Sequence, residues 1–199
     1  MPRNRAAGKQ RAAARRKNNS LSLILVGAGL LFVGAVVLLM IAPGKNSTES
    51  PVRIDSVVPV EVNYPAPKLQ ATDLLEQPVA LSDYRGQVLL VNNWATWCPP
   101  CKAEMPTLKE YYEAHQTDGF VLIGINAGED VDEVAMFASS LSLTFPVWVD
   151  LQESSLRAFR TSSLPSSFVI DRDGQVRLAW TGAIDRDTLE EHVTPIILE

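Results

Sequence analysis

Cysteine and histidine are scarce in this chain of 199 residues, and their scarcity excludes several kinds of site. The only cysteines are Cys98 and Cys101, so no other intramolecular disulfide can form. A zinc ion needs about four ligands, and only His115 and His192 add to this pair, both in stretches expected to be helical. Lys102 stands where a c-type haem would require a histidine. The sequence therefore predicts no metal site and no cofactor.

Acidic residues are absent from the first 45 positions, where basic residues gather instead. Seven Lys and Arg lie within the first 17 residues, whereas residues 45–199 carry 11 of them against 23 acids, a formal net charge of −12. Because the phosphates of a nucleic acid would be repelled by such a surface, we expect no nucleic-acid binding by the main part of the chain.

Charge of either sign is absent from Leu21–Ala42, an apolar run of 22 residues. As a helix this run would span roughly 33 Å at about 1.5 Å per residue, enough to cross the hydrocarbon core of a bilayer. The alternative is a cleaved signal peptide, whose apolar region is usually roughly 7–15 residues long and ends in a small-x-small site. Residues 40–43 (MIAP) lack such a site. The sequence therefore favours an uncleaved, single-pass transmembrane helix.

The basic tail at residues 1–20 predicts the orientation of this anchor. Basic residues are retained on the cytoplasmic side of a membrane, and only Lys45 follows the apolar run closely. The rest of the chain then lies outside the cytoplasm, in a compartment where disulfides persist. We divide this part into an extracytoplasmic linker at residues 43–65 and a folded domain at residues 66–199.

Residues 66–199 alternate short apolar runs with helical patterns, as an α/β domain does. The linker before them is expected to be extended, with Val57–Val62 as a candidate edge strand. The predicted strands are Gln87–Asn92, Phe120–Asn126, Pro146–Val149, Ser166–Ile170 and Val176–Thr181. The predicted helices are Cys98–His115, Asp130–Leu141, Ser154–Arg160 and Asp185–Val193. This order predicts a mixed central sheet with helices on both faces.

Two residues separate Cys98 from Cys101, a spacing that lets a disulfide open and close with little backbone movement. Cys98 should lie at the start of a helix, where unpaired N–H groups and the helix dipole favour a negative sulfur. We therefore expect Cys98 to be the accessible thiolate that attacks a partner's disulfide, and Cys101 to be the buried thiol that later releases the partner. Pro99 and Pro100 remove two N–H donors and stiffen the loop.

Residues 91–106 (VNNWATWCPPCKAEMP) resemble the active-site segment of the TlpA/ResA group of thioredoxin-like proteins. Three further segments agree with this group, namely residues 81–86 (LSDYRG), 143–147 (LTFPV) and 164–171 (LPSSFVID). The resemblance covers roughly residues 65–195 and implies a thioredoxin-like fold.

The resemblance also implies roles for residues near the cysteines. It implies that Pro165 follows a cis peptide bond beside the sulfurs and that the backbone near Leu164 pairs with an extended substrate segment. Glu104 matches a glutamate that is common in the group and is a candidate for proton exchange with Cys101. The alternative for Glu104 is an ordinary helix-surface position. Trp97 adjoins Cys98 in the sequence, and this position makes it a candidate for an apolar rim that partners contact, with a mostly structural role as the alternative.

Asn92 stands where thioredoxin itself has a buried aspartate, and the TlpA/ResA group often has asparagine there. Because an amide cannot take up a proton, a carboxylate base at this position is excluded. Trp94 is expected to pack in the core beneath the cysteine loop. The acids at the start of the helix at residues 130–141 are expected to be solvated and to complement the helix dipole instead of binding a metal. These acids are Glu129, Asp130, Asp132 and Glu133.

The sequence thus predicts a membrane-tethered thiol-disulfide oxidoreductase that acts on protein disulfides. The TlpA/ResA group includes proteins that reduce apocytochrome c with electrons from a transmembrane carrier, and the resemblance implies the same direction, client and donor. Two alternatives stay open. A peroxiredoxin-type peroxidase would carry Thr three residues before its reactive cysteine, where this chain has Ala95. A non-catalytic, tethered binding module would need the disulfide only for structure.

Overall fold

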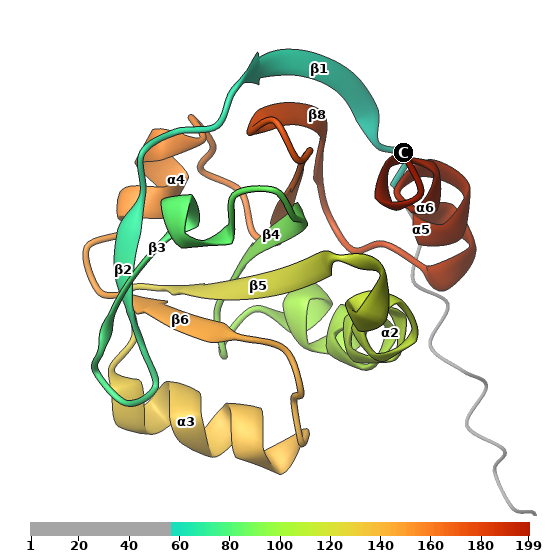
Figure 1. Cartoon of the computed structure of the whole chain (residues 1–199). Helices are drawn as coiled ribbons and strands as arrows, with labels where there is room; N and C mark the ends of the chain where they lie inside the picture. The colour runs from blue at the N-terminus through green and yellow to red at the C-terminus, as the bar shows by residue number, and fades with distance from the viewer. Residues whose placement is uncertain (1–56) are drawn as a thin grey trace, which may run out of the picture. The chain divides into compact units, whose positions relative to one another are not determined.

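Strand β4 (Val88–Trp94) lies inside an eight-stranded sheet in the computed structural model, which describes residues 57–199 (Figure 1). The strand order is β1-β8-β7-β4-β5-β6-β2-β3. β4 pairs in parallel with β5 and antiparallel with β7, so the sheet is mixed. The other strands are β1 (Val60–Pro65), β2 (Gln70–Asp73), β3 (Pro78–Ala80), β5 (Phe120–Ala127), β6 (Val147–Asp150), β7 (Ser166–Ile170) and β8 (Gln175–Thr181).

The apolar run at the start of β4 explains why this strand is buried on both faces. Its first four residues, Val88–Val91, are at most 3% exposed. Helix α2 (Pro99–His115) follows β4, and the chain returns to pair β5 in parallel with β4. β6 pairs in parallel with β5, so the carboxyl ends of β4, β5 and β6 meet at one edge of the sheet.

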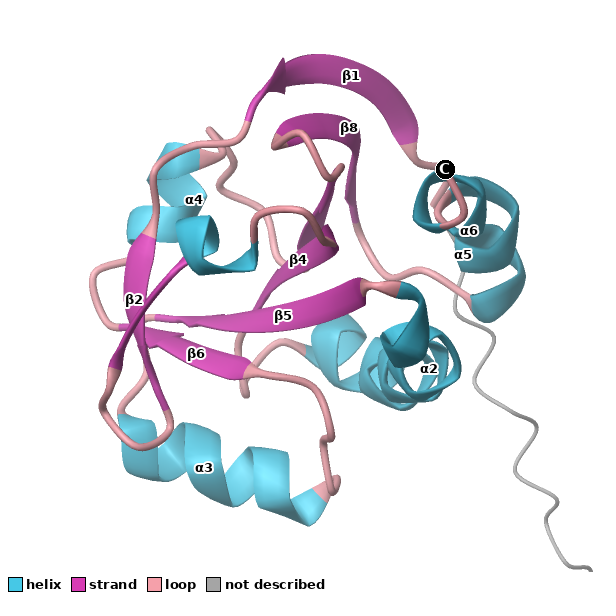
Figure 2. Ribbon diagram, in the orientation of Figure 1, coloured by secondary structure: helices cyan, strands magenta, loops and turns pink. Residues whose placement is uncertain are grey.

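Helices cover both faces of the sheet, as Figure 2 shows. One face packs against α2, α3 (Val131–Ser140), α5 (Arg186–His192) and α6 (Thr194–Ile197). The other packs against α4 (Ser154–Ala158) and the 3-10 helix η1 (Leu81–Tyr84), while a second 3-10 helix, η2 (Gln116–Asp118), precedes β5. Trp94 is fully buried on the first face, with its ring centroid 5.1 Å from that of Phe137, which confirms its predicted place in the core.

The predicted mixed sheet with helices on both faces is confirmed. Each predicted strand and helix of residues 66–199 is found, with its ends within about two residues of those expected. The periodicity of long, apolar elements is a strong signal, which explains this agreement.

Four short elements differ from the prediction. Residues 60–65, which we assigned to the linker, form β1 at the edge of the sheet and pair with β8. The candidate edge strand at Val57–Val62 therefore begins and ends three residues later than expected. β2, β3 and α6 were not predicted, because elements of only three or four residues show no periodicity. Asp73 closes the turn between β2 and β3 by accepting hydrogen bonds from the N–H groups of Leu75 and Gln77.

The predicted transmembrane helix at Leu21–Ala42, the basic tail at residues 1–20 and most of the linker lie outside the described residues. Within residues 57–199, no helix is both long enough and apolar enough to cross a bilayer.

Candidate active site

Cys98 ends a tight turn and begins helix α2. Its N–H donates to the carbonyl oxygen of Ala95 at 3.2 Å, and its sulfur accepts a hydrogen bond from the Cys101 N–H at 3.3 Å. Pro99 and Pro100 occupy the first two helical positions, where a missing N–H costs no intrahelical hydrogen bond. The predicted placement of Cys98 at the helix start and of Cys101 inside the first turn is confirmed.

A disulfide joins Cys98 to Cys101, with 5.3 Å between their Cα atoms. Cys98 is 3% exposed and Cys101 is fully buried, so in this oxidised state only Cys98 reaches the surface. The Cys101 N–H that faces the Cys98 sulfur is placed to stabilise negative charge on it when the disulfide is open. This geometry suits the predicted division of labour, in which Cys98 attacks and Cys101 resolves.

The loop before β7 lies at the same edge of the sheet as the cysteines. The peptide bond between Leu164 and Pro165 is cis, as the resemblance implied. Asn93 in β4 pairs with Ser166 in β7, which puts this loop beside the end of β4 from which the cysteine turn starts. Pro165 is buried, whereas Trp97 is 67% exposed. The exposed indole next to Cys98 is therefore available for contact with a partner.

Glu104 is fully buried one turn after Cys101, and this burial decides between the two interpretations of the residue. Its carboxylate accepts hydrogen bonds from Asn92 Nδ2 at 2.8 Å and from the Ile184 N–H at 3.2 Å. Burial raises the pKa of Glu104 to about 8, although both hydrogen bonds favour the charged form. The helix-surface interpretation is therefore wrong, and this carboxyl can exchange a proton near neutral pH.

Two neighbouring asparagines near the end of β4 connect this strand to other elements by side-chain hydrogen bonds, one on each face of the sheet. Asn92, which is fully buried, donates from Nδ2 to Ser167 Oγ at 3.0 Å as well as to Glu104. Asn93 donates to Ser166 Oγ at 3.3 Å and accepts from Ser155 Oγ at 2.7 Å. The sequence gives no signal for Ser155, because a single serine in a short helix fits any solvated position.

Glu129 is buried, so its predicted solvated position is wrong. It is only 9% exposed and accepts a hydrogen bond from the Thr96 N–H at 2.7 Å, with further hydrogen bonds from the Thr96 hydroxyl and the Asn126 amide. Helix α3 begins at Val131, so Glu129 lies before the helix and turns toward the cysteine loop. The other three acids of this group are exposed, as predicted, namely Asp130, Asp132 and Glu133.

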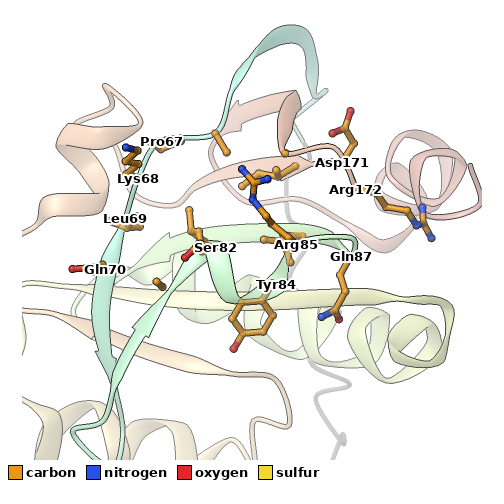
Figure 3. A pocket seen from close by; sticks show the side chains of 16 residues that line it. Pro67, Lys68, Leu69, Gln70, Ser82, Tyr84, Arg85, Gln87, Asp171 and Arg172 are labelled. Atoms are coloured by element: carbon orange, nitrogen blue, oxygen red, sulfur yellow. The ribbon is translucent and has the colours of Figure 1, made fainter.

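A cavity of about 600 Å³ lies at the opposite end of β4 from the cysteines (Figure 3). Leu89 and Ile170 line it together with polar side chains such as Lys68, Tyr84 and Arg85. None of the predicted site residues lines this cavity. Among the residues that the structure describes, no group of three or more His, Cys, Asp or Glu is placed to hold a metal ion.

Comparison with known proteins identifies relatives of this site and fold. The AhpC/TSA family model matches residues 62–179. The thiol-disulfide oxidoreductase ResA of Geobacillus kaustophilus is 38% identical over 137 residues, which cover 69% of this chain and 79% of that protein. ResA of Bacillus subtilis is 31% identical over 131 residues, 66% of this chain and 73% of that protein. The structure of a thiol:disulfide interchange protein DsbE from Chlorobium tepidum matches with a TM-score of 0.64 and 26% identity, and covers 69% of this chain and 99% of that chain.

Proposed function

The chain belongs to the AhpC/TSA family and is a thiol-disulfide oxidoreductase of the ResA type, and on this basis we propose that it reduces protein disulfides outside the cytoplasm while anchored in a membrane. The cysteine pair carries the proposal. Cys98 caps helix α2, and the Cys101 N–H donates to the Cys98 sulfur at 3.3 Å. An electropositive helix start of this kind holds a reactive thiolate.

Reduction of a client begins from the dithiol form of the pair. The Cys98 thiolate attacks one sulfur of the client's disulfide, that S–S bond breaks, and the second client sulfur leaves as a thiolate. Cys101 then loses its proton and attacks the Cys98 sulfur, which releases the first client sulfur as a second thiolate. Two electrons pass to the client, and the pair ends as the disulfide that the structure contains.

Glu104 is suited to exchange a proton with Cys101, which must lose its proton before it attacks. Residues three apart on a helix share a face, so Glu104 and Cys101 lie one above the other in α2. The pKa of Glu104 is raised to about 8, which is close to the ordinary value of about 8.5 for a thiol. Transfer between groups of similar pKa is nearly balanced, so Glu104 can take the proton in one direction of the reaction and return it in the other.

The membrane part of the proposal rests on the sequence. Residues 1–20 would lie in the cytoplasm, Leu21–Ala42 would span the membrane, and the domain would follow a linker on the far side. Electrons that regenerate the dithiol must then come from a transmembrane electron donor. Apocytochrome c, during cytochrome c maturation, is the proposed client because of the resemblance to the TlpA/ResA group.

A Cys101→Ser variant of the full chain tests this function in cells. Without the resolving thiol, Cys98 should stay linked to its client, so a mixed disulfide accumulates and mass spectrometry identifies the captured protein. Cys98→Ser is the matched control, since it lacks the attacking sulfur and should capture nothing. If Cys101→Ser also captures nothing, the exchange mechanism is wrong. Capture of proteins other than cytochrome precursors would leave the reductase in place and overturn the proposed client.

Two assays separate this function from the alternatives. A peroxiredoxin-type peroxidase would consume hydrogen peroxide rapidly. We expect no rapid consumption here, because Ala95 occupies the position of the threonine that is characteristic of such peroxidases. A binding module would keep its function when both cysteines are replaced by serine, whereas the oxidoreductase would lose it.

A further inference from the structure

Glu129 holds a buried charge that no cation neutralises within residues 57–199. The residue is 9% exposed and belongs to none of the ion pairs found there. Three donors face its two oxygens, namely the Thr96 N–H, the Thr96 hydroxyl and the Asn126 amide. A carboxylate has no proton to donate, so these three donors give the negative group hydrogen bonds at both of its oxygens. Because an unpaired buried charge is costly, its position beside the active site calls for an explanation.

We propose that Glu129 is a positioning residue whose negative charge makes the cysteine pair a stronger reductant. This inference rests on the proposed function. Glu129 binds Thr96, which lies in the turn that the hydrogen bond from the Cys98 N–H to the Ala95 oxygen closes at 3.2 Å. Since Thr96 is two residues from Cys98, chain geometry puts the carboxylate within about 10 Å of the Cys98 sulfur.

The charge acts on the dithiol form and not on the disulfide. The reduced pair carries a thiolate at Cys98, which a nearby carboxylate destabilises, whereas the disulfide is uncharged. Destabilising the reduced form lowers the reduction potential, so the pair gives up its electrons more readily. The effect of the Glu129 charge on the Cys98 thiolate is therefore opposite to that of the start of helix α2, which stabilises this thiolate. A unit charge about 10 Å away, at an effective dielectric constant of about 20, changes such an equilibrium by roughly tenfold.

Glu133 provides a matched control. One of its carboxylate oxygens lies 3.0 Å from the Thr96 hydroxyl, but the residue is exposed. The hydroxyl has a single proton, which it shares between Glu129 at the shorter distance and Glu133, and the exposed charge of Glu133 is screened by water and salt. Three further charged residues near the turn are also exposed, namely Lys102, Asp130 and Asp132.

The experiment measures the redox equilibrium of the purified full chain in a dithiothreitol buffer, for the wild type and for variants. Glu129→Gln removes the charge and should shift the equilibrium toward the dithiol by about tenfold, or about 30 mV for a two-electron couple. The ultraviolet absorbance of the thiolate should then appear at lower pH. Glu129→Asp keeps the charge and should shift the equilibrium less, and Glu133→Gln should stay within about twofold of the wild type. Thermal unfolding of each oxidised variant shows whether it is folded.

Thr96→Val covers the case in which Glu129→Gln does not fold. This variant removes one hydrogen-bond donor from the Glu129 carboxylate and keeps its charge. Because the charge is then less compensated, it should destabilise the Cys98 thiolate more and shift the equilibrium toward the disulfide. Equal shifts for Glu129→Gln and Glu129→Asp, or no shift for either, would overturn the inference and leave the oxidoreductase intact. A shift of Thr96→Val toward the dithiol would overturn it as well. A wild-type pair that never equilibrates with the buffer would instead contradict the proposed function.

Discussion

Replacing Glu104 by glutamine should make the domain more stable than the wild type by an amount that grows with pH. In the folded protein the pKa of Glu104 is raised from 4.5 to about 8, chiefly because the carboxyl is buried. Between these two pH values the folded state holds a proton that the unfolded state releases. The wild type therefore loses stability as the pH rises toward 8, whereas glutamine does not titrate.

The size of this effect follows from the two pKa values. Each unit of pKa difference corresponds to about 1.4 kcal/mol, so a rise from 4.5 to about 8 corresponds to on the order of 5 kcal/mol of unfolding free energy. Glutamine resembles the protonated acid in shape and can still accept from Asn92. Its amide would face the Ile184 N–H, a loss of about 1 kcal/mol that does not depend on pH. The slope with pH is therefore the diagnostic quantity.

Urea unfolding of the oxidised protein, followed by tryptophan fluorescence from about pH 5 to about pH 8, measures this slope. The free-energy difference between Glu104→Gln and the wild type should rise by about 1.4 kcal/mol per pH unit and level off above about pH 8. Glu110→Gln, an exposed position on the same helix, is the control and should show no such rise. Parallel curves for Glu104→Gln and the wild type would refute the assignment of a proton-holding, buried Glu104.

Two further predictions concern the partner surface and the membrane. Trp97→Ala should leave the unfolding free energy within about 0.5 kcal/mol of the wild type, because the side chain is 67% exposed. It should slow exchange with a protein disulfide by about tenfold and leave exchange with a small aromatic disulfide unchanged, and equal losses for both substrates would exclude a docking role. Protease added outside intact cells or spheroplasts should digest the domain and spare the first 17 residues, whereas a protected domain would reverse the proposed orientation.

The long elements of the fold could be predicted because each leaves a periodic pattern in the chain. The apolar run at Val88–Val91 predicts a buried strand, and the helix after it begins where expected, with Cys98 as its cap. Of the short strands, β1 was expected three residues too early, at Val57–Val62, and β2 and β3 could not be predicted in the same way. Their pairing depends on neighbours far along the chain, as when β1 pairs with β8 and β2 pairs with β6.

The two glutamates of the site show where prediction from sequence stopped. Glu104 was found only through the resemblance, and its burial could not be derived, because a glutamate in a helix is usually solvated. Glu129 was assigned to a solvated helix start, since its neighbours Asp130 and Asp132 fit that pattern. Nothing local distinguishes one acid of such a group from the next. Of these four acids, the fold buries only Glu129 against the cysteine loop.

The sequence by itself determined the reaction, because the chemistry of two cysteines three positions apart at a helix start depends on short-range geometry. Only the tertiary structure decided what surrounds the sulfurs. Four of the five hydrogen bonds that hold Glu104 and Glu129 join residues 12, 33 or 80 positions apart, and such distances close only when strands and helices pack. Burial then changes what a carboxyl does, because the cost of removing its charge from water is a property of the folded surroundings and not of the residue.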